Sequence, residues 1–192
     1  MARKLTFDIE TIGAFRTSGD MFADLEVTVV GVHDSKTNEY RTFLKDELSQ
    51  LWPLFERADL LVGYNSDHFD IPILNRYYPG DLTKIPSLDI LKEIRTVLGR
   101  RLKLENVAQA TLGRGKSGNG LEAGDWWAQG LIDRVREYCL DDVRLTKELY
   151  DYVQDHGSLK YTDFDGVREI KLNTKTWEKQ KTAHTLTHTL PF

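Results

Sequence analysis

Acidic residues occur at three places in this sequence where a reactive site could assemble. Asp8 and Glu10 lie two apart in a run of alternating polarity, so on a β-strand both carboxylates project from one face. Asp70 follows a short apolar run, and Asp142 lies in a long helical pattern. A single pair carries little weight, since about five pairs with the spacing of Asp8 and Glu10 are expected by chance among the 30 acidic residues. The chemistry becomes specific if folding brings all four together.

Four carboxylates gathered in one place require positive charge. Two like unit charges about 4 Å apart repel by about 4 kcal/mol at an effective dielectric constant of about 20. Hard oxygen ligands, without Cys/His spacing, favour magnesium or manganese over zinc. Two such ions roughly 3.5 to 4 Å apart would activate a water, stabilise the transition state and bind the leaving oxygen of an in-line displacement at phosphorus. The predicted metal ligands are Asp8, Glu10, Asp70 and Asp142.

Tyr138 and Asp142 are four residues apart in the helical pattern Leu131–Val153, which stacks their side chains on one face. Asp141 points roughly 100° away and is interpreted as solvent-facing or as the partner of a nearby basic residue. Each residue has a simpler alternative role. Tyr138 could be a packed aromatic, Asp142 a surface acid, and Asp70 a helix cap.

The elements that would position these residues form an α/β pattern in which strands come first and helices follow. The predicted strands are Lys4–Thr11, Glu26–His33, Glu39–Lys45, Asp59–Asn65 and Pro86–Ile90. The predicted helices are one capped by Asp46 that extends through Phe55, then Ile71–Tyr78, Leu91–Leu98, Leu104–Leu112 and Leu131–Val153. The first three strands favour an antiparallel meander, and the fourth returns by a β-α-β crossover that places its end near Asp8.

The C-terminal part differs in character. Leu159–Leu172 has Asp165-Gly166 between two β-like runs, which indicates a hairpin, and a Thr-rich tail follows it. We therefore expect one domain over residues 1–157 and a hairpin and tail of unknown role over residues 158–192. Gly113–Gly120 is a flexible loop by composition, and its Arg114 and Lys116 are candidate contacts to a substrate backbone.

Three short motifs now matter together: FDIET (Phe7–Thr11), GYNSDHFD (Gly63–Asp70) and YCLDD (Tyr138–Asp142). In order and spacing they resemble the three motifs of the DEDD exonucleases, which have the ribonuclease H-like fold and include the proofreading domains of DNA polymerases. Tyr138 indicates the DEDDy branch, and the chain looks similar to the exonuclease domains of family B polymerases. The resemblance covers about Leu5 to Val153. It implies a mixed five-stranded sheet, a three-strand antiparallel meander plus parallel strands, covered by helices.

The resemblance also implies roles for the acids. Asp8 would bridge two metal ions, while Glu10 and Asp142 complete the site of the ion that activates the nucleophile. Asp70 would hold the second ion largely through water. Tyr138 would orient the attacking water. The activity implied is two-metal-ion removal of nucleotides from a 3′ end.

Substrate contacts are implied for four further positions. Thr11 and Ile12 would touch the terminal nucleotide, and Asn65 and Phe69 would help to seat the 3′ end. The substrate would be single-stranded DNA or RNA with a free 3′ end. Two alternatives stay open: a module that grips a nucleic-acid end without cutting it, and an endonuclease of the ribonuclease H-like group.

Composition limits the remaining choices. The net charge is −4, but the stretch Lys92–Lys116 is locally basic and is either a solvated surface or a strip that contacts phosphates. Cys139 is the single cysteine, so no disulfide forms within the chain, and no apolar run approaches a membrane span. We expect a cytoplasmic protein without a signal peptide, free-standing or serving a polymerase or helicase in trans. Its oligomeric state is open.

Overall fold

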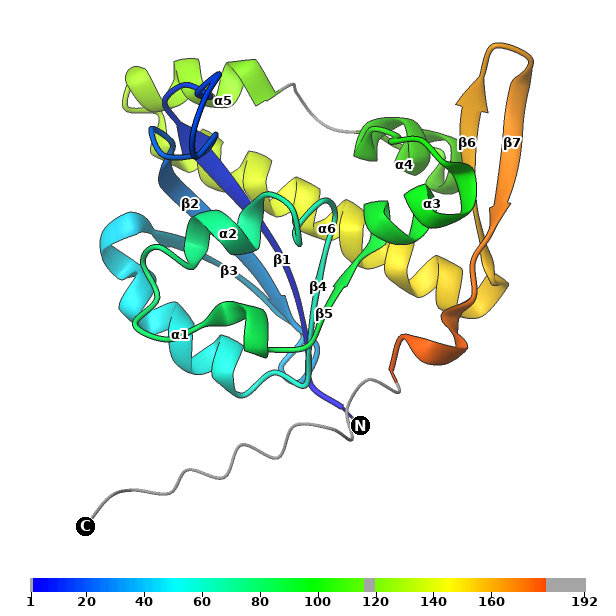
Figure 1. Cartoon of the computed structure of the whole chain (residues 1–192), viewed down its shortest axis with the longest axis horizontal. Coiled ribbons are helices and arrows are strands. Elements are labelled where there is room, and N and C mark those ends of the chain that lie inside the picture. Colours follow the sequence, from blue (N-terminus) through cyan, green and yellow to red (C-terminus); the bar gives the residue numbers. More distant parts are fainter. Residues whose placement is uncertain (1, 116–119, 179–192) are drawn as a thin grey trace.

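The computed structural model describes residues 2–115 and 120–178, and its centre is a five-stranded mixed sheet (Figure 1). Its strands are β1 (Lys4–Ile12), β2 (Glu26–Asp34), β3 (Glu39–Leu44), β4 (Leu60–Gly63) and β5 (Ser87–Asp89). They lie in the order β3-β2-β1-β4-β5. The first three pair antiparallel, while β1, β4 and β5 run parallel. The predicted meander with added parallel strands is confirmed, and β1 is central.

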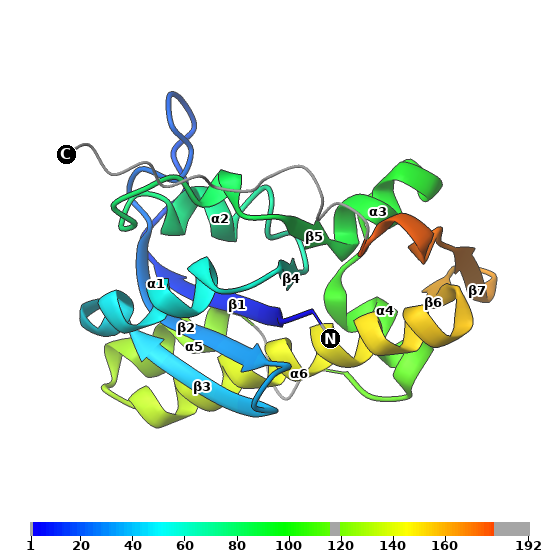
Figure 2. The ribbon, with the colours of Figure 1, turned by 90° about the horizontal axis from the view of Figure 1, so that it is seen from below.

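Helices cover both faces of this sheet. They are α1 (Leu48–Glu56), α2 (Asp70–Leu74), α3 (Ile90–Leu98), α4 (Leu104–Leu112), α5 (Gly120–Ala128) and α6 (Ile132–His156), with short 3₁₀ turns η1 (Lys45–Glu47), η2 (Leu82–Lys84) and η3 (Thr174–Thr176). Figure 2 shows α1 and α2 on one face and α5 and α6 on the other. Within the described ranges, no helix combines the length and the apolarity that crossing a membrane requires.

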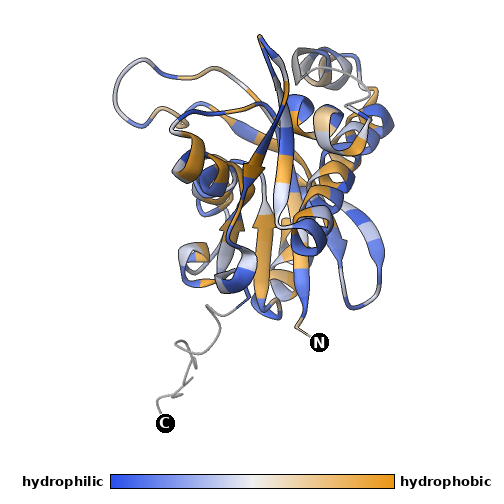
Figure 3. Ribbon diagram, turned by 90° about the vertical axis from the view of Figure 1, so that its right-hand side faces the viewer, coloured by the Kyte–Doolittle hydropathy of each residue, from blue (hydrophilic) through white to orange (hydrophobic). Residues whose placement is uncertain are grey.

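Alternate residues of β1 point to opposite faces of the sheet, so that apolar side chains enter the core on one face and acidic side chains lie on the other. Leu5, Phe7 and Ile9 are buried in one hydrophobic cluster with residues of α1 and α2. The ring of Phe7 meets that of Phe55 edge to face, with centroids 5.2 Å apart. Burying such a side chain stabilises the fold by about 1.5–3 kcal/mol. Figure 3 shows the hydrophobic residues that run along the strands of the sheet. The opposite face of β1 is left to Asp8 and Glu10.

A glycine lets α6 approach that opposite face closely. Gly31 of β2 lies across from Asp8 in the antiparallel pairing. A Cβ at Gly31 would lie 3.0 Å from Cys139 Sγ and 3.0 Å from Val143 Cγ2. Even an alanine here would therefore require Cys139 and Val143, which flank the segment that carries Asp142, to shift by a few tenths of an ångström.

The predicted C-terminal hairpin is present as β6 (Ser158–Asp163) and β7 (Gly166–Lys171), which form a separate two-stranded sheet. Its inner residues belong to the same hydrophobic cluster as α4 and α6. Two side chains of α4 also bind the outer edge of β6. Asn106 Nδ2 donates to the carbonyl of Thr162 at 3.0 Å, and Thr111 Oγ1 donates to that of Lys160 at 3.0 Å. The division between residues 1–157 and 158–192 stays a prediction, and the tail from 179 lies outside the described residues.

Two local predictions are wrong. Asp46 lies within η1 and does not cap α1, whose N-cap is Glu47. The carboxylate of Glu47 instead accepts a hydrogen bond from the backbone N–H of Leu44. The helix expected over Ile71–Tyr78 ends at Leu74, because the carbonyl oxygen of the Asn75 side chain accepts the N–H of Leu82 at 2.7 Å and favours a turn.

Candidate active site

The candidate site lies where β1 has left β4. The two strands pair only as far as Thr6, whereas β1 continues to Ile12. On its other side β1 remains paired with β2, with a register shift between Glu10 and Thr11. Such a bulge bends the strand and re-aims the side chains that follow. Asp8 and Glu10 are both half-buried and lie on β1 beyond its pairing with β4. This is the carboxyl edge of the parallel strands, where α/β proteins place their sites.

Asp8, Glu10 and Cys139 form a close group. Each offers a ligand atom, and these atoms all lie within 4.8 Å of one another. The Cys139 thiol also contacts the Asp8 carbonyl oxygen at 3.5 Å. Burial, reinforced by the charges of the nearby acids, raises the pKa of the Cys139 thiol well above its usual range. A raised pKa disfavours the thiolate, which is the form of cysteine that binds metals, whereas the two carboxylates offer hard oxygen ligands.

Asp70 reaches β1 from the loop after β4. It is the first residue of α2, is buried, and accepts a hydrogen bond from the backbone N–H of Ile9. The helix-capping alternative does not hold, since the N-cap of α2 is Phe69 and makes no side-chain cap. Burial, with the negative charges of Asp89 and Asp142, raises the pKa of Asp70 to about 8. A carboxyl group in this position gains much from a cation that replaces its proton.

Two residues of α6 complete the set. Tyr138 and Asp142 are both buried, and the charge of Asp142 acts on Asp70 and on Cys139. The neighbouring Asp141 instead accepts a hydrogen bond from Arg144 Nη1 at 2.8 Å, as expected for the other face of the helix. Side chains from three distant segments thus meet around β1.

The four acids are not all equally close to one another. Asp8 and Glu10 belong to the 4.8 Å group, and Asp70 and Asp142 do not. Asp70 accepts a hydrogen bond from the backbone of Ile9, the residue that separates Asp8 from Glu10 in the sequence. The negative charge of Asp142 also acts on Asp70. This donor set of carboxylate oxygens fits hard divalent cations.

Comparisons with known proteins show the family and the fold of the chain. A family model of the RNase_H superfamily matches residues 5–154. The chain belongs to the RNase_H superfamily. No curated protein matches it, whereas 142 chains of solved structures do.

One of these structures is that of the family B DNA polymerase from the hyperthermophilic archaeon Pyrobaculum calidifontis. It has a TM-score of 0.63 and 22% sequence identity, over 80% of this chain and 25% of the polymerase chain. At this identity the likeness shows a shared fold, and the chain spans a quarter of the length of the polymerase.

This RNase_H superfamily member holds Asn65 in a strained turn. Its φ is +69°, a conformation that few residues other than glycine adopt. The backbone N–H of Asn65 donates to Asp89 Oδ1 at 2.7 Å, and its side-chain Oδ1 accepts from Arg101 Nη2 at 2.5 Å. Asp89 and Arg101 thus fix Asn65, and neither was singled out for such a role by sequence reasoning.

Phe69 lies in a cluster of rings. Its centroid is 5.4 Å from that of Phe22 and 6.1 Å from that of Phe15. Phe15 is 60% exposed, in the loop that follows β1. Thr11 and Ile12, at the end of β1, are half-buried. The structure therefore places an exposed aromatic beside the predicted contacts, one that sequence reasoning missed because Phe15 carries no motif.

The loop residues are less informative. Arg114 is exposed and pairs with Glu148 of α6, with Nη2 and Oε1 2.5 Å apart. Its predicted contact with a substrate backbone would compete with this ion pair and stays a prediction. Lys116 lies outside the described residues.

Trp126 of α5 packs against Tyr138. Its ring meets that of Tyr138 edge to face, with centroids 5.9 Å apart. Twelve residues separate the two in sequence, and nothing in either pattern indicates the contact. Trp126 therefore limits the space that the Tyr138 ring can occupy.

Proposed function

We propose that the protein is a DEDDy-type 3′-5′ exonuclease, which hydrolyses the terminal phosphodiester of a nucleic-acid strand. The proposal is supported by the close group of Asp8 and Glu10 and by the hydrogen bond that the Ile9 N–H donates to Asp70. It is also supported by the charge of the buried Asp142 on Asp70, with Tyr138 buried one turn earlier on the same helix. Membership of the RNase_H superfamily supports nuclease activity in general. The 3′ direction rests on the motifs that contain these residues.

The residues fit two divalent cations, Mg²⁺ or Mn²⁺. The donor atoms are carboxylate oxygens, and the raised pKa of the buried Asp70 marks a position where added positive charge is favourable. Asp8, Glu10, Asp70 and Asp142 would hold the ions. Bound there, divalent cations lower the pKa of a water and offset charge on the phosphate.

The protein's own groups orient the substrate. Tyr138 would direct the attacking water with its hydroxyl group. Thr11 and Ile12 would contact the terminal nucleotide, while Asn65 and Phe69 seat the 3′ end. Single-stranded DNA or RNA is the proposed substrate, and a polymerase or helicase acting in trans is the proposed kind of partner.

Trp126→Ala is expected to lower kcat about tenfold with little change in KM. The edge-to-face contact is worth about 0.5–1.5 kcal/mol, and its loss frees the Tyr138 ring to leave its working orientation. Single-turnover release from a labelled oligonucleotide measures the effect. Trp126→Phe keeps an aromatic contact and should restore most of the rate. Equal rates for the two variants would contradict a positioning role.

The proposal is tested with oligonucleotides labelled at the 5′ end. Wild-type protein with Mg²⁺ or Mn²⁺ should shorten single-stranded DNA or RNA stepwise from the 3′ end, and a 3′-terminal phosphorothioate should slow the first step. A circular strand should stay intact. Nicking of the circle would instead indicate an endonuclease, and tight binding without shortening at any metal concentration would indicate an end-binding module.

A further inference from the structure

A cavity of about 260 Å³ lies beside the proposed active site. Its lining includes Asn65 and His68 from the loop after β4, Lys92 and Arg95 from α3, and Arg101 from the loop after α3. The loop that supplies Asn65 and His68 leads directly to α2, whose first residue is Asp70. The cavity therefore borders the segment that carries a proposed metal ligand.

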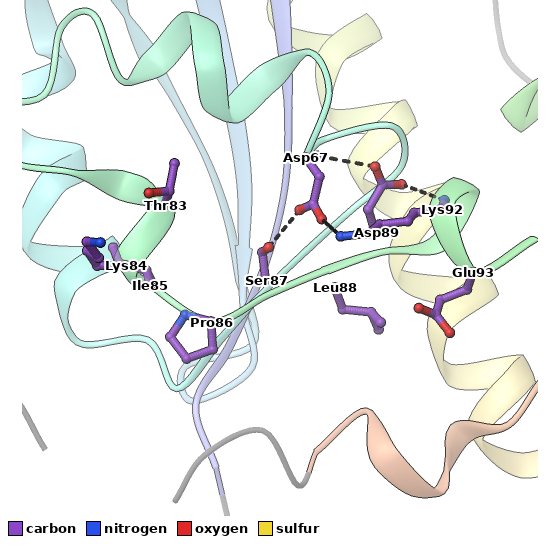
Figure 4. Close-up of a pocket in the computed structure, with 10 residues that line it drawn as sticks. All are labelled: Asp67, Thr83, Lys84, Ile85, Pro86, Ser87, Leu88, Asp89, Lys92 and Glu93. Carbon is purple, nitrogen blue, oxygen red and sulfur yellow. Dashed lines mark hydrogen bonds and ion pairs between the residues drawn. The ribbon is translucent and has the colours of Figure 1, made fainter. Parts of the chain in front are cut away.

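The carboxylates of this cavity are already engaged. Asp89 accepts the backbone N–H groups of Asn65, Asp67 and Lys92 at 2.7, 3.2 and 3.2 Å. Asp67 accepts from Ser87 Oγ and from Lys92 Nζ, each at 2.6 Å. Figure 4, a close-up of a neighbouring pocket that shares Asp67, Asp89 and Lys92 with this cavity, shows Asp67 turned toward Ser87 and Lys92. Asp67 thus neutralises Lys92, and the two acids hold the loop and α3 together.

The two arginines are in a different state. Arg95 and Arg101 are both exposed, and among the residues that the structure describes neither has a carboxylate within ion-pair distance. Arg100 and Arg114, by contrast, pair with Asp163 and Glu148. Within residues 2–115 and 120–178, the one hydrogen bond of the Arg101 side chain is to the neutral amide of Asn65. A guanidinium stays ionised at every relevant pH, and its planar fork matches a phosphate.

We propose that this cavity is a subsite for a phosphodiester of the substrate strand, bound by Arg95 and Arg101. This proposal rests on the proposed function. A chain with a net charge of −4 and several acids at its centre repels a nucleic acid, unless cationic groups lie on the approach. These two arginines supply that charge next to the loop that leads to Asp70.

The rings on the far side of the same loop agree with this path. His68 lines the cavity, and its ring also meets Phe22 with centroids 5.8 Å apart. Phe22 in turn contacts Phe15 and Phe69. Cationic groups that follow the backbone, with aromatic rings for the bases, are the usual means of holding a single strand. The loop after β4 has the two arginines on one side and the aromatic rings on the other.

The test separates binding from cleavage. In an Asp8→Ala background with Mg²⁺, fluorescence anisotropy of a labelled single-stranded 12-mer (about 4–16 nucleotides fill such sites) gives Kd at several salt concentrations. Arg95→Gln and Arg101→Gln should each raise Kd about 3- to 30-fold and reduce the slope of log Kd against log salt by about 0.7. Arg101→Lys should restore the slope and part of the affinity. Arg57→Gln, at the exposed end of α1, is the matched control and should have the Kd and salt slope of the Asp8→Ala background.

The outcomes distinguish the two proposals. Unchanged Kd and salt slope in both arginine variants, with melting temperatures equal to that of the background, would overturn the subsite. That result would leave shortening from the 3′ end intact if the proposed function is right. Conversely, failure of wild-type protein to shorten any strand would overturn the function, while loss of affinity in the arginine variants would still support the subsite.

Discussion

Replacement of Asp8 by alanine is expected to lower the rate of nucleotide release by at least about a thousandfold, roughly 4 kcal/mol at 1.36 kcal/mol per factor of ten. Asp8 lies at the centre of the proposed ligand set. Its ligand atom is within 4.8 Å of that of Glu10, and the next residue, Ile9, binds the Asp70 carboxylate. Loss of Asp8 therefore removes a ligand that both ions would share.

Single-turnover assays with a 5′-labelled strand and saturating Mg²⁺ measure this change, and circular dichroism checks that the variant is folded. Asp141→Asn is a matched control on α6, because Asp141 accepts a hydrogen bond from Arg144 and is not one of the proposed metal ligands. Its rate should stay within about twofold of wild type, as for most surface substitutions. An Asp8→Ala protein that retains a tenth of the activity would refute the metal assignment.

Much of the sheet could be predicted because its signals are local. Leu5, Phe7 and Ile9 alternate with polar residues, which sets the face of β1 that enters the core. The apolar run of β4 and the helical crossover that precedes it predict that β4 pairs beside β1, and the structure shows this pairing. The proposed acids follow from the same logic, since period and strand order are enough to bring Asp8 toward Asp70.

The parts that could not be predicted depend on contacts between distant residues. α2 ends at Leu74 because the side chains that follow it form hydrogen bonds with the backbone of distant segments. Arg76, for example, donates to the carbonyl oxygens of Phe22 and Leu25. The same holds for Trp126 against Tyr138. Such contacts form only once the sheet has assembled, so no local pattern encodes them.

The environment of Asp70 is the clearest example of this limit. Sequence places the residue in the turn after β4, where capping and metal binding are equally plausible. Burial of its carboxyl group and the hydrogen bond from Ile9 exist only in the folded protein. These two features give Asp70 a measurable signature in the pH dependence of stability.

For metal-free protein, the free energy of unfolding should fall as the pH rises from about 4 to about 8. Burial, with the charges of Asp89 and Asp142, raises the pKa of Asp70 to about 8, against about 3.9 for an ordinary aspartate. Between these values the unfolded chain has released a proton that the folded chain still holds, so stability is lost with rising pH. By pH 7 the loss is on the order of 4 kcal/mol, at 1.36 kcal/mol per unit.

Asp70→Asn should remove this dependence. The amide does not titrate, and its oxygen can still accept the N–H of Ile9. In chelator, the variant should match wild type near pH 4 and unfold at a higher urea concentration than wild type at pH 8. Urea titrations across this range measure the difference, and Asp141→Asn is expected to follow wild type throughout.

Magnesium should narrow the difference between the two proteins at pH 8. A ligand that binds only the folded state stabilises it by about 2.7 kcal/mol at a hundredfold excess over its Kd, and the ionised Asp70 carboxylate is a proposed ligand. Wild type should therefore gain several degrees in melting temperature with saturating Mg²⁺, and Asp70→Asn should gain much less. Equal gains would remove Asp70 from the metal centre. A wild-type stability that stays flat from pH 4 to pH 8 in chelator would show that its carboxyl group is not held protonated by the fold.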